Sequence, residues 1–245
     1  MFSHSKYDTI TSLLPFLIDI SSILKCDIIS YDYIGTGLSS GKYNEDDVQT
    51  SLENIIDFMC SVTDIKLNNI LLMGQSFGAK PTVQVVSKSK YDNIAGIILI
   101  SPLENYLASK YNKTMNITIS NIQSVKCPVF LIQGKYDLKE QVEKTEELAT
   151  YITNLYKWFP KKQRTANILN GCRWKFYKKF MNFIDFIKQK SFHKISTHHL
   201  NLSTPIDNIN NQHIVNNTIN KNYISFTIDG EDYLNSYNKD NYSER

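Results

Sequence analysis

The sequence is poor in cysteine and in long apolar runs, and each scarcity excludes a class of protein. The four cysteines are isolated, without Cys-x-x-Cys spacing, so neither a zinc site nor a disulfide framework is expected. This usage fits a reducing, cytoplasmic compartment. No basic segment followed by an apolar stretch stands at the start, so we expect no signal peptide. The most apolar early window, residues 10–24, contains Asp19 and is too short to span a bilayer.

Neither sign of charge is in large excess over the other. The formal net charge is +3, and the basic residues are scattered, with Lys161, Lys162 and Arg164 as the nearest approach to a cluster. A nucleic-acid partner would need a basic patch or stripe, so none is expected. The hydrophobic fraction of 42% and the charged fraction of 21% are ordinary for a globular domain.

Short apolar runs alternate with segments of helical periodicity. We predict strands at residues 26–33, 69–73, 96–101, 129–133 and 165–170. The first four runs show little polar alternation, which is typical of strands buried on both faces. Helices are predicted after Asp46 and Asp47, from about residue 138 to 155, and as a closing helix over 174–187. Strands that alternate with helices predict an α/β fold with a mostly parallel, doubly wound sheet.

The composition changes near residue 191. We therefore predict one domain over residues 1–190 and an asparagine-rich, disordered tail over 191–245, which has no sustained periodicity. Such tails are often passive, and the alternatives of a partner-binding, scaffolding or localisation segment stay open.

The chemistry-bearing motif is Gly-x-Ser-x-Gly at residues 74–78, between a predicted strand and a helix-compatible segment. In this context the pattern indicates a nucleophile elbow, a strained turn that lifts the hydroxyl of Ser76 above the sheet. Gly74 and Gly78 are expected because a side chain at either position would collide with its neighbours. The backbone N–H of Phe77 would then point at a developing oxyanion. A chance match of a short pattern is the alternative.

Around this motif the sequence resembles the alpha/beta-hydrolase domain-containing protein 17 group. The matching runs are Phe-Ser-His at 2–4, Tyr-Asp-Tyr-Ile-Gly-Thr-Gly-Leu-Ser-Ser-Gly-Lys at 31–42, Gly-Gln-Ser-Phe-Gly at 74–78, Ile-Ile-Leu-Ile-Ser-Pro-Leu at 97–103 and Cys-Pro-Val-Phe-Leu-Ile-Gln-Gly at 127–134. The resemblance runs from residue 1 to about 134, and weakly on to 187. It implies an α/β-hydrolase fold and a serine hydrolase that removes palmitate from protein cysteines.

The resemblance also implies partners and a location. The substrate would be an acylated protein or a lipid-like ester, and no metal or organic cofactor would be needed. The protein would be cytoplasmic, with peripheral contact at the cytosolic face of membranes as an option. The group attaches to membranes through an N-terminal cysteine cluster that the given sequence does not contain, so stable anchoring is not expected.

Carried over residue by residue, the resemblance assigns Ser76 as nucleophile and Asp137 as the acid of the triad. Asp137 also follows a predicted strand at its carboxyl end, where open α/β sheets place their sites. The alternative is an N-cap for the helix that starts near Leu138. The oxyanion loop of the group matches residues 4–6, so the backbone N–H groups of Ser5 and Lys6 become donors, although Ser5 replaces a glycine. Asp32 is interpreted as a structural residue that bonds the turns of the glycine-rich loop.

The general base is missing from its expected place. Where the group has its catalytic histidine, this sequence has Arg173 or Trp174, and neither side chain can accept the proton of a serine. His4 belongs to the oxyanion loop, where packing is the simpler interpretation. The other histidines lie at or beyond the start of the predicted tail: His193, His198, His199 and His213. The alternative function is therefore a catalytically impaired relative that binds a lipid or a protein partner.

A second departure concerns the N-terminal strands. Residues 1–3 match the last residues of a strand of the group. In members of the group, further strands come before this strand. We therefore expect the N-terminal strands of the fold to be missing. Without that strand, the runs at 26–33 and 69–73 would lack their common neighbour, and their backbone groups would stay unpaired.

Overall fold

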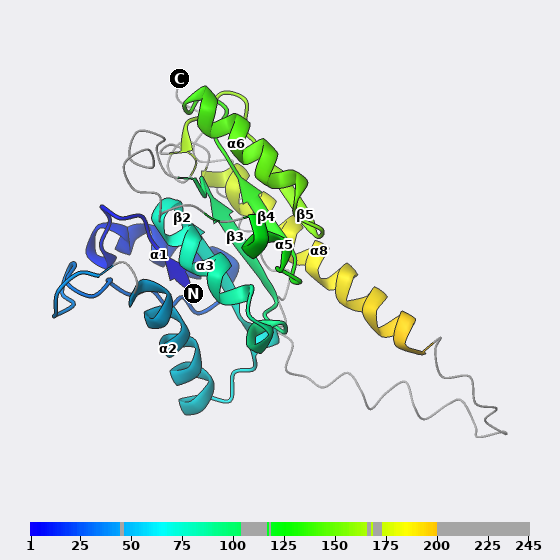
Figure 1. Cartoon of the computed structure of the whole chain (residues 1–245), viewed down its shortest axis with the longest axis horizontal. Coiled ribbons are helices and arrows are strands. Elements are labelled where there is room, and N and C mark those ends of the chain that lie inside the picture. The colour runs from blue at the N-terminus through cyan, green and yellow to red at the C-terminus, as the bar shows by residue number, and fades with distance from the viewer. Residues whose placement is uncertain (45–46, 104–116, 118, 166–167, 169–172, 200–245) are drawn as a thin grey trace.

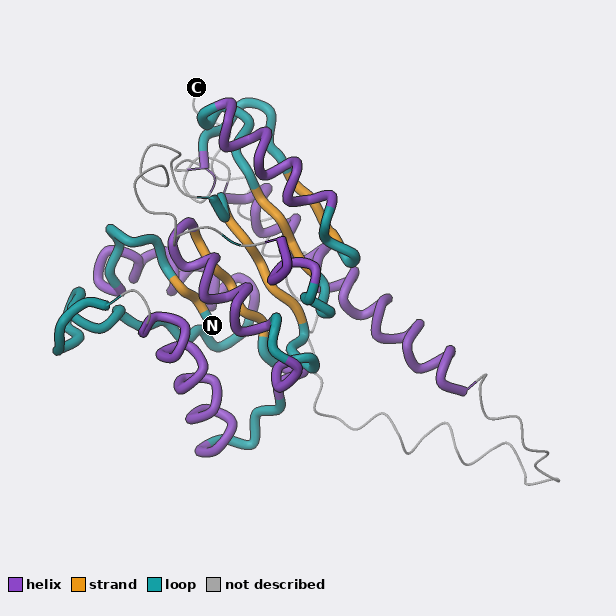
Figure 2. Tube along the Cα trace, in the orientation of Figure 1, coloured by secondary structure: helices purple, strands orange, loops and turns teal. Residues whose placement is uncertain are grey.

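The computed structural model describes residues 1–44, 47–103, 117, 119–165, 168 and 173–199. In this part of the chain, parallel strands form one sheet in the order β1-β2-β3-β4-β5 (Figures 1 and 2). The strands are β1 Phe2–Ser3, β2 Leu71–Gln75, β3 Gly96–Ile100, β4 Val129–Ile132 and β5 Leu155–Trp158. The predicted parallel α/β sheet is confirmed.

Helices cover both faces of this sheet. One face carries α2 Asp47–Val62, α3 Ala79–Val86, α5 Ile119–Gln123 and α6 Lys139–Thr150. The other face carries α1 Ile10–Leu24 and the long helix α8 Arg173–His199, drawn in yellow in Figure 1. Short 3-10 helices complete the described elements: η1 Leu67–Asn69, η2 Ser76–Gly78 and η3 Ser89–Tyr91.

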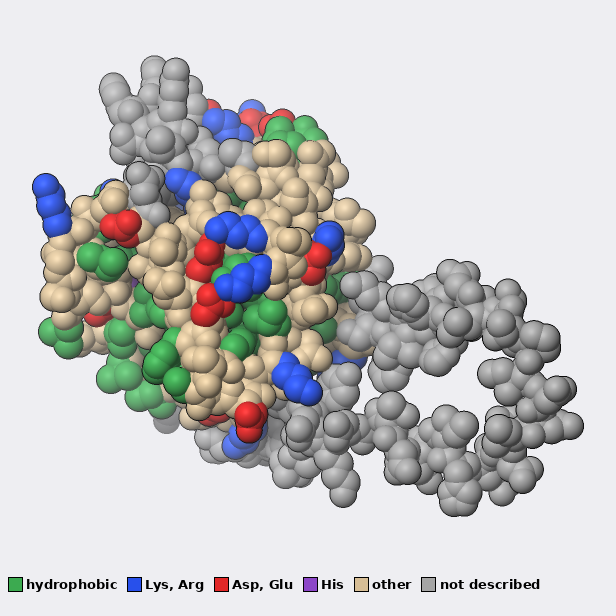
Figure 3. Space-filling view, turned by 60° about the horizontal axis from the view of Figure 1, so that its bottom comes forward, with side chains coloured by type: hydrophobic (Ala, Val, Ile, Leu, Met, Phe, Trp, Pro, Cys, Tyr) green, Lys and Arg blue, Asp and Glu red, His purple; other side chains and the backbone are tan. Residues whose placement is uncertain are grey.

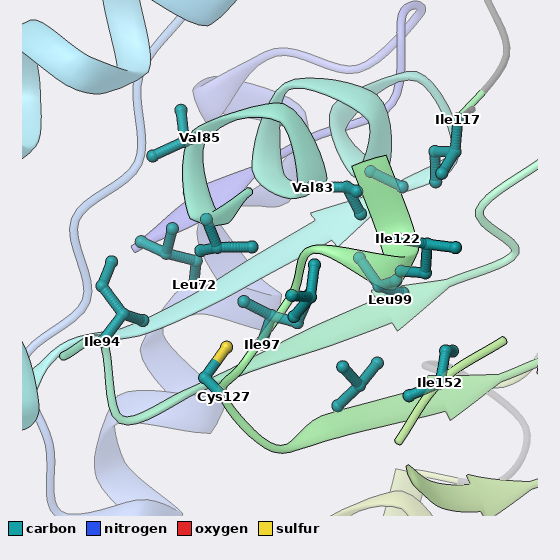
Figure 4. Close-up of a cluster of buried hydrophobic side chains, with 14 of the residues drawn as sticks. Leu72, Val83, Val85, Ile94, Ile97, Leu99, Ile117, Ile122, Cys127 and Ile152 are labelled. Atoms are coloured by element: carbon teal, nitrogen blue, oxygen red, sulfur yellow. The ribbon is translucent and has the colours of Figure 1, made fainter. Parts of the chain in front are cut away.

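The strands contribute side chains to the hydrophobic clusters on both faces, because side chains alternate between the two faces of a sheet. In β3, Ile97 and Leu99 belong to the cluster under α2 and α3, while Ile98 and Ile100 belong to the cluster under α1 and α8. Figure 4 shows the first cluster, where side chains from neighbouring strands meet Val83 of α3. All of these β3 side chains are fully buried, and burial of each stabilises the fold by about 1.5–3 kcal/mol.

The second cluster is rich in aromatic rings. The ring of Phe130 lies 5.0 Å from that of Tyr156 and 5.3 Å from that of Phe183 on α8. Helix α8 thus lies against β4 and β5, and the closing helix predicted over 174–187 is confirmed.

Two predicted strands are wrong. Residues 26–33 make only one bridge, between Ser30 and Phe2, because β1 has two residues and offers no longer ladder. In the run at 165–170, the described residues Thr165 and Ile168 are helical. The strand next to β4 is β5 instead, which begins at Leu155, the last residue of the helix predicted over 138–155. That helix, α6, ends at Thr150.

The common neighbour expected to be lost is present. Residues 1–3 lie between the 26–33 segment and β2, with the N–H of Phe2 donating to the carbonyl of Ile29 at 2.8 Å. On the other side, the N–H of Met73 donates to the carbonyl of Met1 at 2.8 Å. The two segments are therefore paired through β1.

The boundary predicted at residue 191 falls inside α8, which continues to His199. Residues 200–245 lie outside the described residues, so the disordered tail stays a prediction. No described helix is both long and apolar enough to cross a membrane. On the face shown in Figure 3, acidic and basic side chains are intermixed. Ion pairs also join separate elements of the described chain, such as Lys88 with Glu53 and Lys126 with Asp92.

Candidate active site

Ser76 lies at the junction between β2 and η2. Its φ is +49°, a left-handed conformation that costs a residue other than glycine about 1–3 kcal/mol. The side chain is half-buried, and α3 begins three residues later at Ala79. The strained strand-to-helix bend expected of a nucleophile elbow is therefore present at the predicted residue.

Both glycines of the motif lie where a side chain would collide. A Cβ on Gly74 would lie 2.5 Å from the carbonyl oxygen of Gly78, and a Cβ on Gly78 would lie 2.0 Å from that of Ser3. The predicted reason for these glycines is confirmed. The second contact also shows that the loop after β1 packs directly against the elbow.

That loop carries the predicted oxyanion donors Ser5 and Lys6. The hydroxyl of Tyr33 donates to the carbonyl of His4 at 2.5 Å, and Nδ1 of His4 lies 2.8 Å from the carbonyl oxygen of Ser5. The hydroxyl of Ser5 donates to Asp8 at 2.5 Å. The loop is thus held by side chains as well as by its contact with Gly78.

Asp32 contacts both the same loop and the segments next to it. Its carboxylate accepts hydrogen bonds from the backbone N–H groups of Ile10 at 2.9 Å and of Leu38 at 3.3 Å. Its Oδ1 also lies 3.5 Å from Nε2 of the fully buried His4. These contacts join the start of α1 to the glycine-rich loop, as expected of a structural role.

The carboxylate of Asp137 is anchored by Thr165 and Gln133. It accepts hydrogen bonds from the N–H of Thr165 at 3.0 and 3.1 Å, from the hydroxyl of Thr165, and from Nε2 of Gln133 at 2.6 Å. The alternative role as an N-cap is wrong, because α6 begins at Lys139 and its N-cap residue, Leu138, makes no side-chain cap bond. Asp137 instead ties the turn after β4 to the segment around residue 165.

Sequence reasoning missed the buried polar cluster behind Asp137. The Oε1 of Gln133 accepts hydrogen bonds from the hydroxyls of Ser101 at 3.2 Å and Thr145 at 3.1 Å. Gln133 is fully buried, and Ser101 has a φ of +46°. Ser101 and Gln133 directly follow β3 and β4, so polar residues at the carboxyl ends of adjacent strands were the available signal.

The expected position of the histidine is occupied by an ion pair. Arg173 pairs with Asp19 of α1, and the two side chains are 41% and 35% exposed. Trp174 packs beside the aromatic cluster of α8. Neither residue is a base. The side chains of His193, His198 and His199 and the whole of His213 lie outside the described residues, as do residues 169–172 of the loop.

Two phenols, those of the partly buried Tyr31 and the buried Tyr33, lie beside the elbow. Burial raises the pKa of Tyr31 to about 12, although its hydrogen bond with Ser3 lowers it in part. Burial also raises the pKa of Tyr33 far above its usual value. Both hydroxyls therefore stay protonated at neutral pH, and that of Tyr33 donates to the carbonyl of His4. Among the described residues, no group of three or more His, Cys, Asp and Glu side chains could hold a metal ion.

The parallel sheet with a tight strand-to-helix bend after β2 is the arrangement of the α/β-hydrolase fold, and solved structures share this fold. An esterase of Pyrococcus furiosus, Pf2001, superposes with a TM-score of 0.60 at 18% identity, covering 75% of this chain and 80% of that one. A predicted CIB-like hydrolase of Thermoplasma acidophilum gives a TM-score of 0.54 at 18% identity, over 77% of this chain and 84% of its own.

The family model of the Hydrolase_4 group, described as serine aminopeptidase, S33, matches residues 25–213. The chain belongs to this family. Among its relatives, alpha/beta hydrolase domain-containing protein 17C of Mus musculus is 32% identical over 158 residues, 62% of this chain and 48% of the relative. The putative alpha/beta hydrolase L404 of Acanthamoeba polyphaga mimivirus is 30% identical over 56% of this chain and 54% of its own. The chain thus spans about half the length of the curated relatives it matches.

Proposed function

We propose that this chain is a serine hydrolase of acyl esters or thioesters, with Ser76 as its nucleophile. The observation that carries the proposal is the conformation of Ser76, which is half-buried at a φ of +49° between β2 and η2. A strained serine at the carboxyl end of a central strand has its hydroxyl exposed to a substrate, which is what the nucleophile elbow achieves. Membership of a hydrolase family supports the same proposal.

The reaction has two steps. The Oγ of Ser76 bonds to the acyl carbonyl carbon, the bond to the leaving sulfur or oxygen breaks, and water then hydrolyses the acyl-enzyme. The N–H of Phe77 and the N–H groups of Ser5 or Lys6 would stabilise the oxyanion. The serine proton passes to a base, with Asp137 as the proposed acid that orients it. The histidines whose side chains lie outside the described residues are the candidates for this base: His193, His198, His199 and His213.

The leaving group favours a thioester substrate. A cysteine thiol has a pKa near 8.5, so a thiolate leaves as an anion close to neutral pH, whereas an amine or an alkoxide must be protonated as it leaves. A site with Arg173 and Trp174 at the expected histidine position is therefore best suited to thioesters. We propose an acylated protein as substrate, in the manner of a depalmitoylase, in the cytoplasm and in contact with membrane surfaces.

A fluorophosphonate probe tests the nucleophile, because it forms a covalent bond with an activated serine. Wild-type protein should be labelled at Ser76, and Ser76→Ala should abolish the labelling. Ser87→Ala, at the far end of α3, is the matched control and should be labelled at the wild-type rate. Labelling that persists in Ser76→Ala, or a wild-type protein that is never labelled, contradicts the proposal.

The second candidate function is a catalytically impaired relative that binds a lipid or a protein partner. The ion pair between Arg173 and Asp19 favours it, because this position joins α8 to α1 instead of carrying a base. Arg173→His and Trp174→His, each assayed on an acyl thioester, separate the two functions. A gain of orders of magnitude over an inactive wild-type chain supports the impaired relative, whereas Ser76-dependent turnover by the unmodified chain contradicts it.

A further inference from the structure

We infer that Tyr33 and His4 are positioning residues that fix the direction of the two loop amides of the oxyanion site, an inference that rests on the proposed function. A trans peptide is planar, and its C=O and N–H groups point in opposite directions. The carbonyl of His4 shares a peptide with the N–H of Ser5, and the carbonyl of Ser5 shares one with the N–H of Lys6. A side chain that holds either carbonyl therefore also aims the opposite N–H.

Tyr33 holds the first peptide. Its hydroxyl donates to the carbonyl of His4 at 2.5 Å, and the residue is only 1% exposed. Its ring lies 4.5 Å from that of His4 and 5.2 Å from that of Phe77, measured between ring centroids. Since Phe77 supplies the other proposed donor, Tyr33 links both sides of the oxyanion site.

His4 holds the second peptide. A carbonyl oxygen can only accept, so Nδ1 of His4 carries the hydrogen that it shares with the carbonyl of Ser5 at 2.8 Å. The opposite nitrogen, Nε2, faces the carboxylate of Asp32 at 3.5 Å. Asp32 is itself fixed by the backbone N–H groups of Ile10 and Leu38. The imidazole is therefore held through Nδ1, while Nε2 lies against the carboxylate of Asp32 without a hydrogen bond.

We call the hydrogen bonds of Tyr33 and His4 to the loop carbonyls the two clamps of the loop. They compensate for the serine at position 5, where the related group has glycine. The hydroxyl of Ser5 is bonded to Asp8 at 2.5 Å, so the side chain of the loop residue is itself anchored. Donors that are aimed before the reaction need no reorganisation in the transition state, which is where oxyanion sites obtain their effect. Loss of a clamp should therefore lower the rate of acylation more than the affinity for the substrate.

Tyr33→Phe tests the first clamp, with Tyr31→Phe as a matched control. Tyr31 is a partly buried phenol in edge-to-face contact with Tyr33, but its hydroxyl bonds the side chain of Ser3 and not a loop carbonyl. Loss of one oxyanion donor lowers kcat by about 10²–10³. Loss of its positioning should lower fluorophosphonate labelling of Ser76, and kcat on an acyl thioester, by about 10-fold or more. KM should stay within about 3-fold, and Tyr31→Phe should keep the wild-type rate.

The second clamp is tested by His4→Asn against His4→Gln. The amide nitrogen of Asn can reproduce Nδ1 and its bond to Ser5, whereas that of Gln reproduces Nε2 and faces Asp32. His4→Asn should retain most of the labelling rate and His4→Gln should lose it. Equal losses in the two variants, once corrected for the folded fraction by urea titration, overturn this role for His4.

The inference and the proposed function can fail separately. If wild-type protein is not labelled at Ser76, the proposed function fails. The clamp is then judged by the NMR order parameters of the Ser5 and Lys6 amides. These should fall from a rigid value near 0.85 toward 0.6 in Tyr33→Phe and stay unchanged in Tyr31→Phe. If the protein is labelled but Tyr33→Phe and Tyr31→Phe behave alike in labelling and in order parameters, the inference is wrong.

Discussion

The two halves of the candidate site differ in how their residues are used. On the side of β1 and β2, the elbow, its glycines and the oxyanion loop pack against one another, with Gly78 directly against Ser3. On the side of β4 and α8, Asp137 is tied to Thr165, and the expected histidine position holds an ion pair with Asp19. The elbow half is thus held by residues that also build the fold, whereas the described contact of Arg173 joins α8 to α1 and supplies no base.

The largest effect should come from Gly78→Ala. The new Cβ would lie 2.0 Å from a backbone oxygen of Ser3, so either β1 or the elbow must move. We expect a loss of about 3 kcal/mol in the free energy of unfolding, measured by urea titration, together with loss of Ser76 labelling. Gly96→Ala is the control, because its Cβ meets the flexible end of Ile187 at 3.0 Å and the carbonyl of Pro128 at 3.1 Å. Similar losses in both variants would show that packing at the elbow is not special.

Gln133→Leu probes the other half. It removes the donor to Asp137 and leaves the hydroxyl of Ser101 without its acceptor in a buried place, whereas Thr145 keeps the carbonyl of Gln141 at 2.8 Å. An unsatisfied buried polar group costs about 1–3 kcal/mol, so we expect a loss of about 2 kcal/mol in urea titration. If labelling of Ser76 stays at the wild-type rate per folded molecule, the acid side does not contribute to activation of Ser76.

Alkaline pH should act on the elbow half. Burial raises the pKa of Tyr31 to about 12 and that of Tyr33 further, whereas in the unfolded chain both titrate near 10. The stability that the neutral phenols contribute is therefore complete below pH 10 and is lost as pH rises from 10 through 12. Each phenol should lower the free energy of unfolding by about 1.4 kcal/mol per pH unit in this window. Urea titrations at pH 9, 10 and 11 measure the slope, and Tyr31→Phe should remove one phenol's share of it. A slope that is unchanged in Tyr31→Phe would contradict the assignment.

The smallest effect should come from Arg173→Ala. Its partner Asp19 is 35% exposed, and solvent-exposed ion pairs contribute about 0.2–1 kcal/mol. A double-mutant cycle with Asp19→Asn, followed by thermal unfolding, measures the coupling. A coupling well above 1 kcal/mol would mean that Arg173 is a structural residue of the α1–α8 contact and not a freely exchangeable position.

The sequence was sufficient to predict those elements whose structure is determined by a local pattern. The runs at β2, β3 and β4 are continuously apolar because both faces are covered, and the elbow follows from two glycines and a serine. Strand β5 was missed because it lies at the edge with Lys157 exposed, so its apolar residues also fitted the end of a helix. The bonds of Asp137 could not be predicted, since Thr165 lies 28 residues away and only the folded chain brings them together.

The pairing of β1 has a consequence for the order of folding. The backbone N–H of Met73 donates to the carbonyl of Met1 at 2.8 Å, and this long-range pairing must form before the elbow has its packing surface. Contacts of such long range form slowly, because the loop entropy is lost before they stabilise the chain. We expect fluorophosphonate labelling of Ser76 to appear late in refolding, after the helices have formed.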